Sequence, residues 1–214
     1  MNILDEPGSY AKYDSNNMIG DVQNIPIQYQ EAWKASRKIS LPKSYHSVDN
    51  IIVLGMGGSA IAGDLVSQVF SGNNGLSVSV CRNYEFSRDV DDRTLVVASS
   101  YSGNTEETLS SFQVAMKTSA KLFVITGGGK LMHMAKDNDI PFFPINYQSK
   151  PRAALGYILM PLLSISDQIS HLDDIQIGIK NSVSQITELE QRIGVSVSVK
   201  NNEAKQLAES INGR

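Results

Sequence analysis

The chain has 214 residues, with 19 Lys and Arg against 22 Asp and Glu and a formal net charge of -3. This length accommodates one α/β domain with additional helices and buries a core without disulfides or metal ions. The acidic balance provides no basic field for nonspecific nucleic-acid binding, so we expect no nucleic-acid partner.

Cysteine content and the N-terminus indicate the compartment. Cys81 is the single cysteine, which excludes an intrachain disulfide and a cysteine-based zinc site. The first residues lack the positive start and apolar stretch of a secretory signal, and no apolar run is long enough to cross a membrane. We therefore expect a soluble cytoplasmic protein that is not exported and has no membrane partner.

Residues 1–49 are predicted to form an N-terminal helical extension. Apolar side chains recur at helical spacing in two groups separated by Pro26, which breaks or kinks a helix. We expect a helical hairpin that packs on another part of the protein. The first group is Met18, Ile19 and Val22, and the second is Tyr29, Ala32, Trp33 and Ala35.

Residues 50–150 alternate short apolar runs with helical patterns. Most of the runs are continuous, which is typical of strands buried on both faces. Strands that alternate with helices predict an α/β fold with a doubly wound, mostly parallel, five-stranded sheet flanked by helices. We expect the strands at residues 51–54, 76–81, 94–98, 121–125 and 140–145.

Two of the intervening segments have apolar side chains at helical spacing. Residues 60–70 are predicted to be a helix, and so are residues 104–117. Ligands of doubly wound sheets bind beyond the carboxyl ends of the strands, where the winding reverses. The apolar positions are Ile61, Leu65, Val66 and Val69 in the first helix and Thr108, Leu109, Phe112 and Met116 in the second.

Residues 151–214 contain no expected strand and form helices and a connecting segment. Residues 153–170 predict a long apolar helix, followed by more polar helices at 177–193 and 202–211. The apolar helix needs cover, either from the N-terminal hairpin or from another subunit, so we expect a homodimer.

The first motif follows the first expected strand and opens a helix. It reads Gly55-Met56-Gly57-Gly58-Ser59. Glycines allow backbone N–H groups to approach a ligand, and the helix start adds partial positive charge, so the motif suits an anion. The structural alternative is a tight turn whose glycines serve only packing.

The same residues fit a dinucleotide-binding pattern, Gly55-x-Gly57-x-x-Ala60. The Asp or Glu expected about 20 residues later is missing. Arg82 could suit a 2′-phosphate, so an NADP-binding protein remains an alternative.

The second motif is dense in hydroxyl groups. Ser100, Ser102 and Thr105 follow the third expected strand and precede a helix, and Gly103 and Asn104 add backbone N–H groups. Together these donors predict a phosphate-binding site. A capping box, with Asn104 as N-cap and Glu107 three residues later, explains only part of the motif.

Other candidate groups are assigned to structure. The glycines at 127–129 form a third loop that lacks further hydroxyls, and we expect it to shape the cleft or cap a strand. The helix dipole lowers the basicity of Glu106 and Glu107. No spacing suited to metal ligands occurs, so no metal or cofactor is expected. The three histidines, also read as structural, are His46, His133 and His171.

The order of these motifs resembles the sugar isomerase (SIS) domain, and the whole chain is similar to the N-terminal portion of bifunctional phosphoglucose/phosphomannose isomerases. Two further segments carry the resemblance. Residues 151–156 are similar to a hallmark of that group, and residues 202–208 to its interdomain linker.

The resemblance implies isomerisation of glucose 6-phosphate, and of mannose 6-phosphate, to fructose 6-phosphate through a cis-enediolate. Arg152 would lie beside the reacting carbons and stabilise the developing charge, with a surface ion pair as its structural alternative. The implied phosphate-binding and loop residues are Gly57, Gly58, Ser59, Ser100, Ser102 and Thr105.

Members of this family carry a second SIS domain that supplies the glutamate base and a ring-opening histidine. None is present in these 214 residues, so we expect half of a catalytic site, completed by a second SIS domain or polypeptide. The alternative is a module that binds a phosphosugar without converting it.

Overall fold

The computed structural model describes residues 2–71, 75–87 and 89–212. The chain divides into two compact units, one formed by Gln28–Ile175 and the other by Met1–Ile27 together with Gln176–Arg214. The larger unit contains the sheet and every residue singled out above as a candidate for binding or catalysis.

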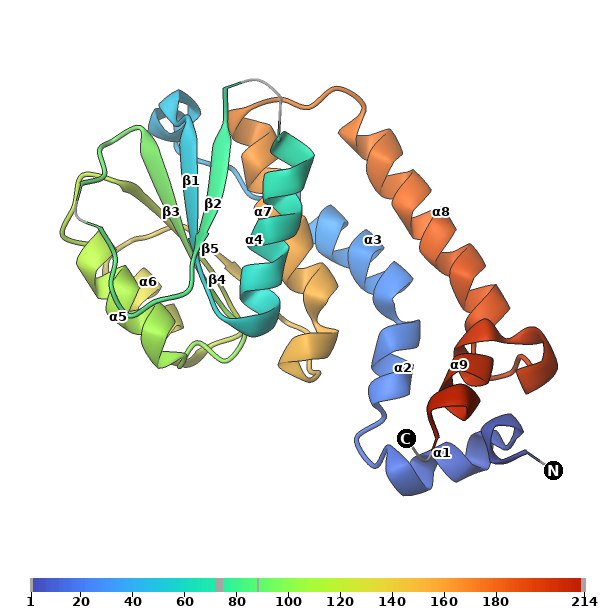
Figure 1. Ribbon diagram of the computed structural model, residues 1–214. Helices are drawn as coiled ribbons and strands as arrows, with labels where there is room; N and C mark the ends of the chain where they lie inside the picture. Colours follow the sequence, from blue (N-terminus) through green and yellow to red (C-terminus); the bar gives the residue numbers. More distant parts are fainter. Residues whose placement is uncertain (1, 72–74, 88, 213–214) are drawn as a thin grey trace. The chain divides into compact units, whose positions relative to one another are not determined.

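A five-stranded, entirely parallel sheet with strand order β2-β1-β3-β4-β5 forms the larger unit (Figure 1). All five expected strands are confirmed. Every residue of the central strand β3 is buried, because helices cover both faces of the sheet. The strands are β1 (Asn50–Leu54), β2 (Ser77–Cys81), β3 (Thr94–Ser100), β4 (Lys121–Thr126) and β5 (Phe142–Pro144).

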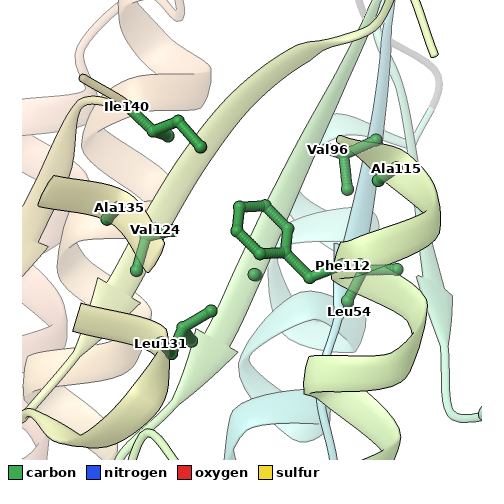
Figure 2. Close-up of a cluster of buried hydrophobic side chains, with 9 residues drawn as sticks. Leu54, Val96, Phe112, Ala115, Val124, Leu131, Ala135 and Ile140 are labelled. Atoms are coloured by element: carbon green, nitrogen blue, oxygen red, sulfur yellow. The ribbon is translucent and has the colours of Figure 1, made fainter. Parts of the chain in front are cut away.

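Helices lie on both faces of the sheet, as in a doubly wound fold (Figure 1). Helices α4 (Gly57–Phe70) and α7 (Leu155–Ile169) lie on one face, and α5 (Glu106–Ala115) and α6 (Gly129–Asp137) lie on the other. Figure 2 shows Phe112 of α5 among the buried side chains that join α5 and α6 to the sheet. The winding therefore reverses between β1 and β3, which is where such sheets bind ligands.

Helix α4 is a helix as predicted, but of its four predicted apolar positions only Val66 is buried. Ile61, Leu65 and Val69 are each more than two-fifths exposed. Small residues form much of the buried side, and a Cβ added at Gly63 would lie 2.7 Å from Val80 Cγ2 of β2. Small side chains let the helix axis come close to the sheet. Close packing therefore buries the small residues and leaves most of the predicted apolar positions exposed.

The long apolar helix α7 is covered within the larger unit. Twelve of its residues are buried. Helix α3 (Ile25–Ser36) packs against it so closely that a Cβ on Gly156 would lie 2.7 Å from Gln28 Cβ. Of the two predicted covers, the N-terminal helical segment therefore supplies one, and α7 gives no argument for a dimer. Pro26 lies in the first turn of α3, where a missing N–H is tolerated.

The smaller unit is formed by the N-terminal and C-terminal segments of the chain. It contains α1 (Pro7–Tyr13), α2 (Met18–Gln23), most of α8 (Ile175–Ile193) and α9 (Glu203–Ile211). The buried amine of Lys205 donates to Asp5 Oδ1 at 3.1 Å and to the Val195 carbonyl at 2.9 Å. Among the described residues, no helix has the length and hydrophobicity that a membrane span requires.

A tyrosine pair provides a test of packing in the larger unit. Tyr157 stacks on Tyr147 with ring centroids 4.9 Å apart, and its hydroxyl donates to Glu31 Oε2 at 2.8 Å. Burial, reinforced by the bond to Glu31, raises the pKa of Tyr157 from 10.0 to about 12. Because the folded pKa is the higher one, this contribution to stability is complete below about pH 10 and is lost as the pH rises through about 12.

We expect the free energy of unfolding to fall between pH 10 and about 12, and to fall less in Tyr157→Phe. Urea denaturation across this range measures the effect. Ultraviolet titration of the phenolates gives a second readout, since the variant loses the group that titrates near pH 12. An identical pH dependence in both proteins would contradict the assignment.

Candidate functional site

The first glycine loop connects β1 to α4. Gly55 lies between Ser59 and the end of β3, and a Cβ there would lie 3.1 Å from Ser59 Cβ and 3.2 Å from the Ser99 carbonyl oxygen. Gly57 has a φ of +51°, and no atom in the described part of the chain lies within 4 Å of its Cβ position, so this point of the loop is open. Ser59 is buried, and α4 begins without a side-chain cap.

The second loop, between β3 and α5, brings the predicted hydroxyls together. Ser100 Oγ lies 2.8 Å from Thr105 Oγ1 and 3.5 Å from Ser102 Oγ, and the Gly103 N–H donates to it at 3.1 Å. Ser100 is buried, Thr105 is half-buried and Ser102 is exposed. The three groups therefore form one cluster, here called the hydroxyl cluster, that runs from the interior to the surface and whose members bond to one another.

The predicted capping box at α5 is wrong. The N-cap residue is Thr105, not Asn104, and no side chain caps the helix. The Thr105 hydroxyl turns to Ser100 instead, while the Asn104 side chain accepts from Lys130 N–H at 3.0 Å. No side-chain cap therefore uses the N–H groups of the first turn of α5, and the helix dipole makes this position favourable for an anion.

The third glycine loop, between β4 and α6, packs against the second loop. In addition to the Asn104 contact, the carbonyl of Gly103 accepts from Leu131 N–H at 2.9 Å. The Gly103 backbone comes so close that a Cβ would lie 1.7 Å from the Gly128 carbonyl oxygen. This loop therefore braces the hydroxyl cluster.

Arg152 lies beside the first loop, in the short 3-10 helix Pro151–Ala153. A Cβ on Gly58 would lie 3.3 Å from the Pro151 carbonyl oxygen and 4.0 Å from Arg152 Cα. Arg152 is exposed, and no carboxylate within residues 2–71, 75–87 and 89–212 forms an ion pair with it. The surface ion pair considered above is therefore not observed in this part of the chain.

Tyr101, between Ser100 and Ser102, was not among the residues that the sequence pattern indicated. Its hydroxyl donates to the Tyr147 carbonyl at 2.6 Å and accepts from Ser149 N–H at 2.8 Å. Both partners are backbone groups more than 40 positions away, so no local pattern could reveal the contact.

Arg82 and His46 contact other parts of the protein. Arg82, the candidate for a 2′-phosphate, forms an ion pair with Asp64 of α4. Within the described residues, no three His, Cys, Asp or Glu side chains come together in a way that could hold a metal ion. His46 Nδ1 lies 3.0 Å from the Gln168 carbonyl oxygen, as expected for a structural role.

Comparison with known proteins identifies relatives of this chain. Residues 44–140 match the model of the SIS domain. A bifunctional phosphoglucose/phosphomannose isomerase from Caldicellulosiruptor bescii is 37% identical over 89% of this chain and 56% of its own length. A protein of the same name from Thermoplasma acidophilum is 42% identical over 58% of this chain and 38% of its own length.

A solved structure has the same fold. Hypothetical protein TT0462 from Thermus thermophilus superimposes with a TM-score of 0.64 at 21% identity, over 94% of this chain and half of that one. The present chain spans about half the length of these relatives.

Proposed function

Because residues 44–140 match the SIS domain and most of this chain is similar to a curated bifunctional phosphoglucose/phosphomannose isomerase, we propose that it takes part in the isomerisation of glucose 6-phosphate and mannose 6-phosphate to fructose 6-phosphate. The observation that carries the proposal is the hydroxyl cluster at the uncapped start of α5. We propose that the reaction takes place in the cytoplasm.

The hydroxyl cluster would bind the 6-phosphate. A phosphate dianion offers stronger acceptors than neutral hydroxyls do, so Ser100, Ser102 and Thr105 exchange their mutual bonds for bonds to its oxygens. The N–H groups at the start of α5 add donors, and the helix dipole adds partial positive charge. Ser59 would contribute a further hydroxyl from the first loop, where Gly57 and Gly58 face the sugar.

Arg152 would act at the other end of the substrate. Moving a proton between C1 and C2 passes through a cis-enediolate, whose oxygens carry negative charge that the substrate lacks. A cation held beside the first loop stabilises that charge in the transition state. The exposure of Arg152 and its freedom from carboxylates in the described chain suit this role.

The carboxylate base would come from outside this chain, since Glu106 and Glu107 lie in the first turn of α5, where the dipole favours the ionised form. We propose that a second SIS half, in a longer chain or in a partner such as a second copy, completes the site. A chain that binds hexose 6-phosphate without turnover would fit both this half-site and the binding-module alternative.

Ser102→Ala tests the phosphate site. We expect the dissociation constant for fructose 6-phosphate to rise about tenfold or more, because a hydrogen bond to a charged oxygen is lost. Thermal stability should hardly change, since Ser102 is exposed. Isothermal titration calorimetry measures the binding.

Ser182→Ala serves as the matched control, because its exposed hydroxyl donates to the Gly178 carbonyl within α8, away from the hydroxyl cluster. NADP should give no binding heat with any of these proteins. Wild-type protein that fails to bind any hexose 6-phosphate, or Ser102→Ala protein that binds like the wild type, would refute the proposal.

A further inference from the structure

Tyr101 connects the hydroxyl cluster to the segment that carries Arg152. Its half-buried side chain bonds to two backbone groups, the Tyr147 carbonyl and the Ser149 N–H. These groups lie a few residues before Arg152, in the connection from β5 to the 3-10 helix Pro151–Ala153. The Tyr101 phenol thus holds the backbone that leads to Arg152, while the Tyr147 ring is held separately by stacking on Tyr157.

The same segment is fixed at its far end by other groups. The Gln28 side-chain amide donates to the Ala153 carbonyl at 2.7 Å, and the Pro151 carbonyl lies against Gly58. Arg152 therefore lies between two points at which hydrogen bonds hold the backbone, here called anchors. Tyr101 provides the anchor on the side of the hydroxyl cluster, and Gln28 provides the one on the side of α3.

The second loop does not depend on the Tyr101 hydroxyl for its own conformation. The Tyr101 carbonyl accepts from Gly127 N–H at 3.0 Å, and Gly103 N–H donates to the Ser100 carbonyl at 3.1 Å. These are backbone bonds, so removal of the phenol oxygen leaves them in place. The hydroxyl cluster should therefore keep its geometry when the connection to residues 147–149 is released.

We propose that Tyr101 is a positioning residue, whose hydroxyl bonds to the backbone of residues 147–149 hold Arg152 beside the first glycine loop. This inference rests on the proposed function. Tyr101 would not touch the substrate; it would act through Arg152. Its loss should weaken recognition of negative charge at C1 and C2 while recognition of the 6-phosphate persists.

Two ligands separate these effects. Fructose 6-phosphate carries the phosphate alone, whereas 5-phosphoarabinonate adds a carboxylate where the enediolate oxygens would form. For Tyr101→Phe we expect an about tenfold weaker affinity for 5-phosphoarabinonate, the scale of one hydrogen bond to a charged group. Affinity for fructose 6-phosphate should remain within about twofold. Calorimetry on the full chain measures both, with Tyr13→Phe, an exposed tyrosine of the other unit, as control.

A double-mutant cycle with Arg152→Gln identifies the residue through which Tyr101 acts. The double variant should bind 5-phosphoarabinonate about as weakly as Arg152→Gln alone, because the two substitutions remove the same interaction. Equal losses for both ligands, additive losses in the double variant, or no loss in Tyr101→Phe would each overturn the inference. Wild-type protein that binds neither ligand would instead refute the proposed function.

Discussion

Replacing Gly103 with alanine is expected to lower the free energy of unfolding by about 3 kcal/mol or more and to weaken hexose 6-phosphate binding about a hundredfold. The backbone there has a φ of +67°, which costs a residue with a Cβ about 1–2 kcal/mol. The added Cβ would also lie 1.7 Å from the Gly128 carbonyl oxygen and 2.6 Å from its carbon.

These neighbours are backbone atoms and have no rotamer to change, so the second and third loops must move apart. That movement breaks the bonds from Leu131 N–H to Gly103 and from Lys130 N–H to Asn104, at about 1 kcal/mol each. It also displaces the hydroxyl cluster from the start of α5, which is why the loss of binding should exceed that of a single hydroxyl deletion.

Gly75→Ala is the matched control for backbone strain. Gly75 has a φ of +73°, close to that of Gly103, but no atom of the described residues lies within 4 Å of its Cβ position. We expect a loss of only about 1 kcal/mol and unchanged ligand affinity. Urea denaturation and calorimetry measure both quantities. Equal destabilisation of the two variants, with hexose 6-phosphate binding intact in Gly103→Ala, would contradict the role given to this close contact.

Strands such as β3 were predictable because burial on both faces leaves a continuous apolar run in the sequence. The buried side of α4 was not, because periodicity shows that a helix has an apolar side but not that small residues allow a closer approach. Ile61 is exposed for this reason, while Gly63 lies against β2. Packing distance depends on two elements together, which a pattern in one of them does not contain.

The hydroxyl cluster could be read from the sequence because its members, Ser100, Ser102 and Thr105, lie close together along the chain. The contacts that brace it could not. The Asn104 side chain accepts from the Lys130 N–H in the first turn of α6 and does not cap α5. The same limit applies to Lys205, whose amine donates to Asp5 near the other end of the chain. In each case the partner is distant in sequence and nothing local marks it.

The ion pair between Arg37, directly after α3, and Asp167 of α7 should respond asymmetrically to removal of its two partners. Arg37 Nη1 lies 2.6 Å from Asp167 Oδ2. The carboxylate is 3% exposed, whereas the arginine side chain is 38% exposed and lies over the Trp33 ring. Removing the arginine leaves the buried Asp167 carboxylate without its cationic partner. Removing the carboxylate leaves an Arg37 side chain that water still reaches.

We therefore expect Arg37→Met to lower the free energy of unfolding by about 3 kcal/mol and Asp167→Asn by about 1 kcal/mol. Methionine keeps the apolar contact with Trp33, so the difference reports on charge. In Asp167→Asn the amide oxygen can still accept from Leu172 N–H, which bonds to Asp167 Oδ1 at 3.1 Å in the wild type. His171 Nδ1 lies 3.8 Å from Asp167 Oδ1, but its side chain is largely exposed, so solvent weakens this contact. Urea denaturation at neutral pH measures both variants. Equal losses, or a larger loss in Asp167→Asn, would show that the buried carboxylate does not depend on Arg37.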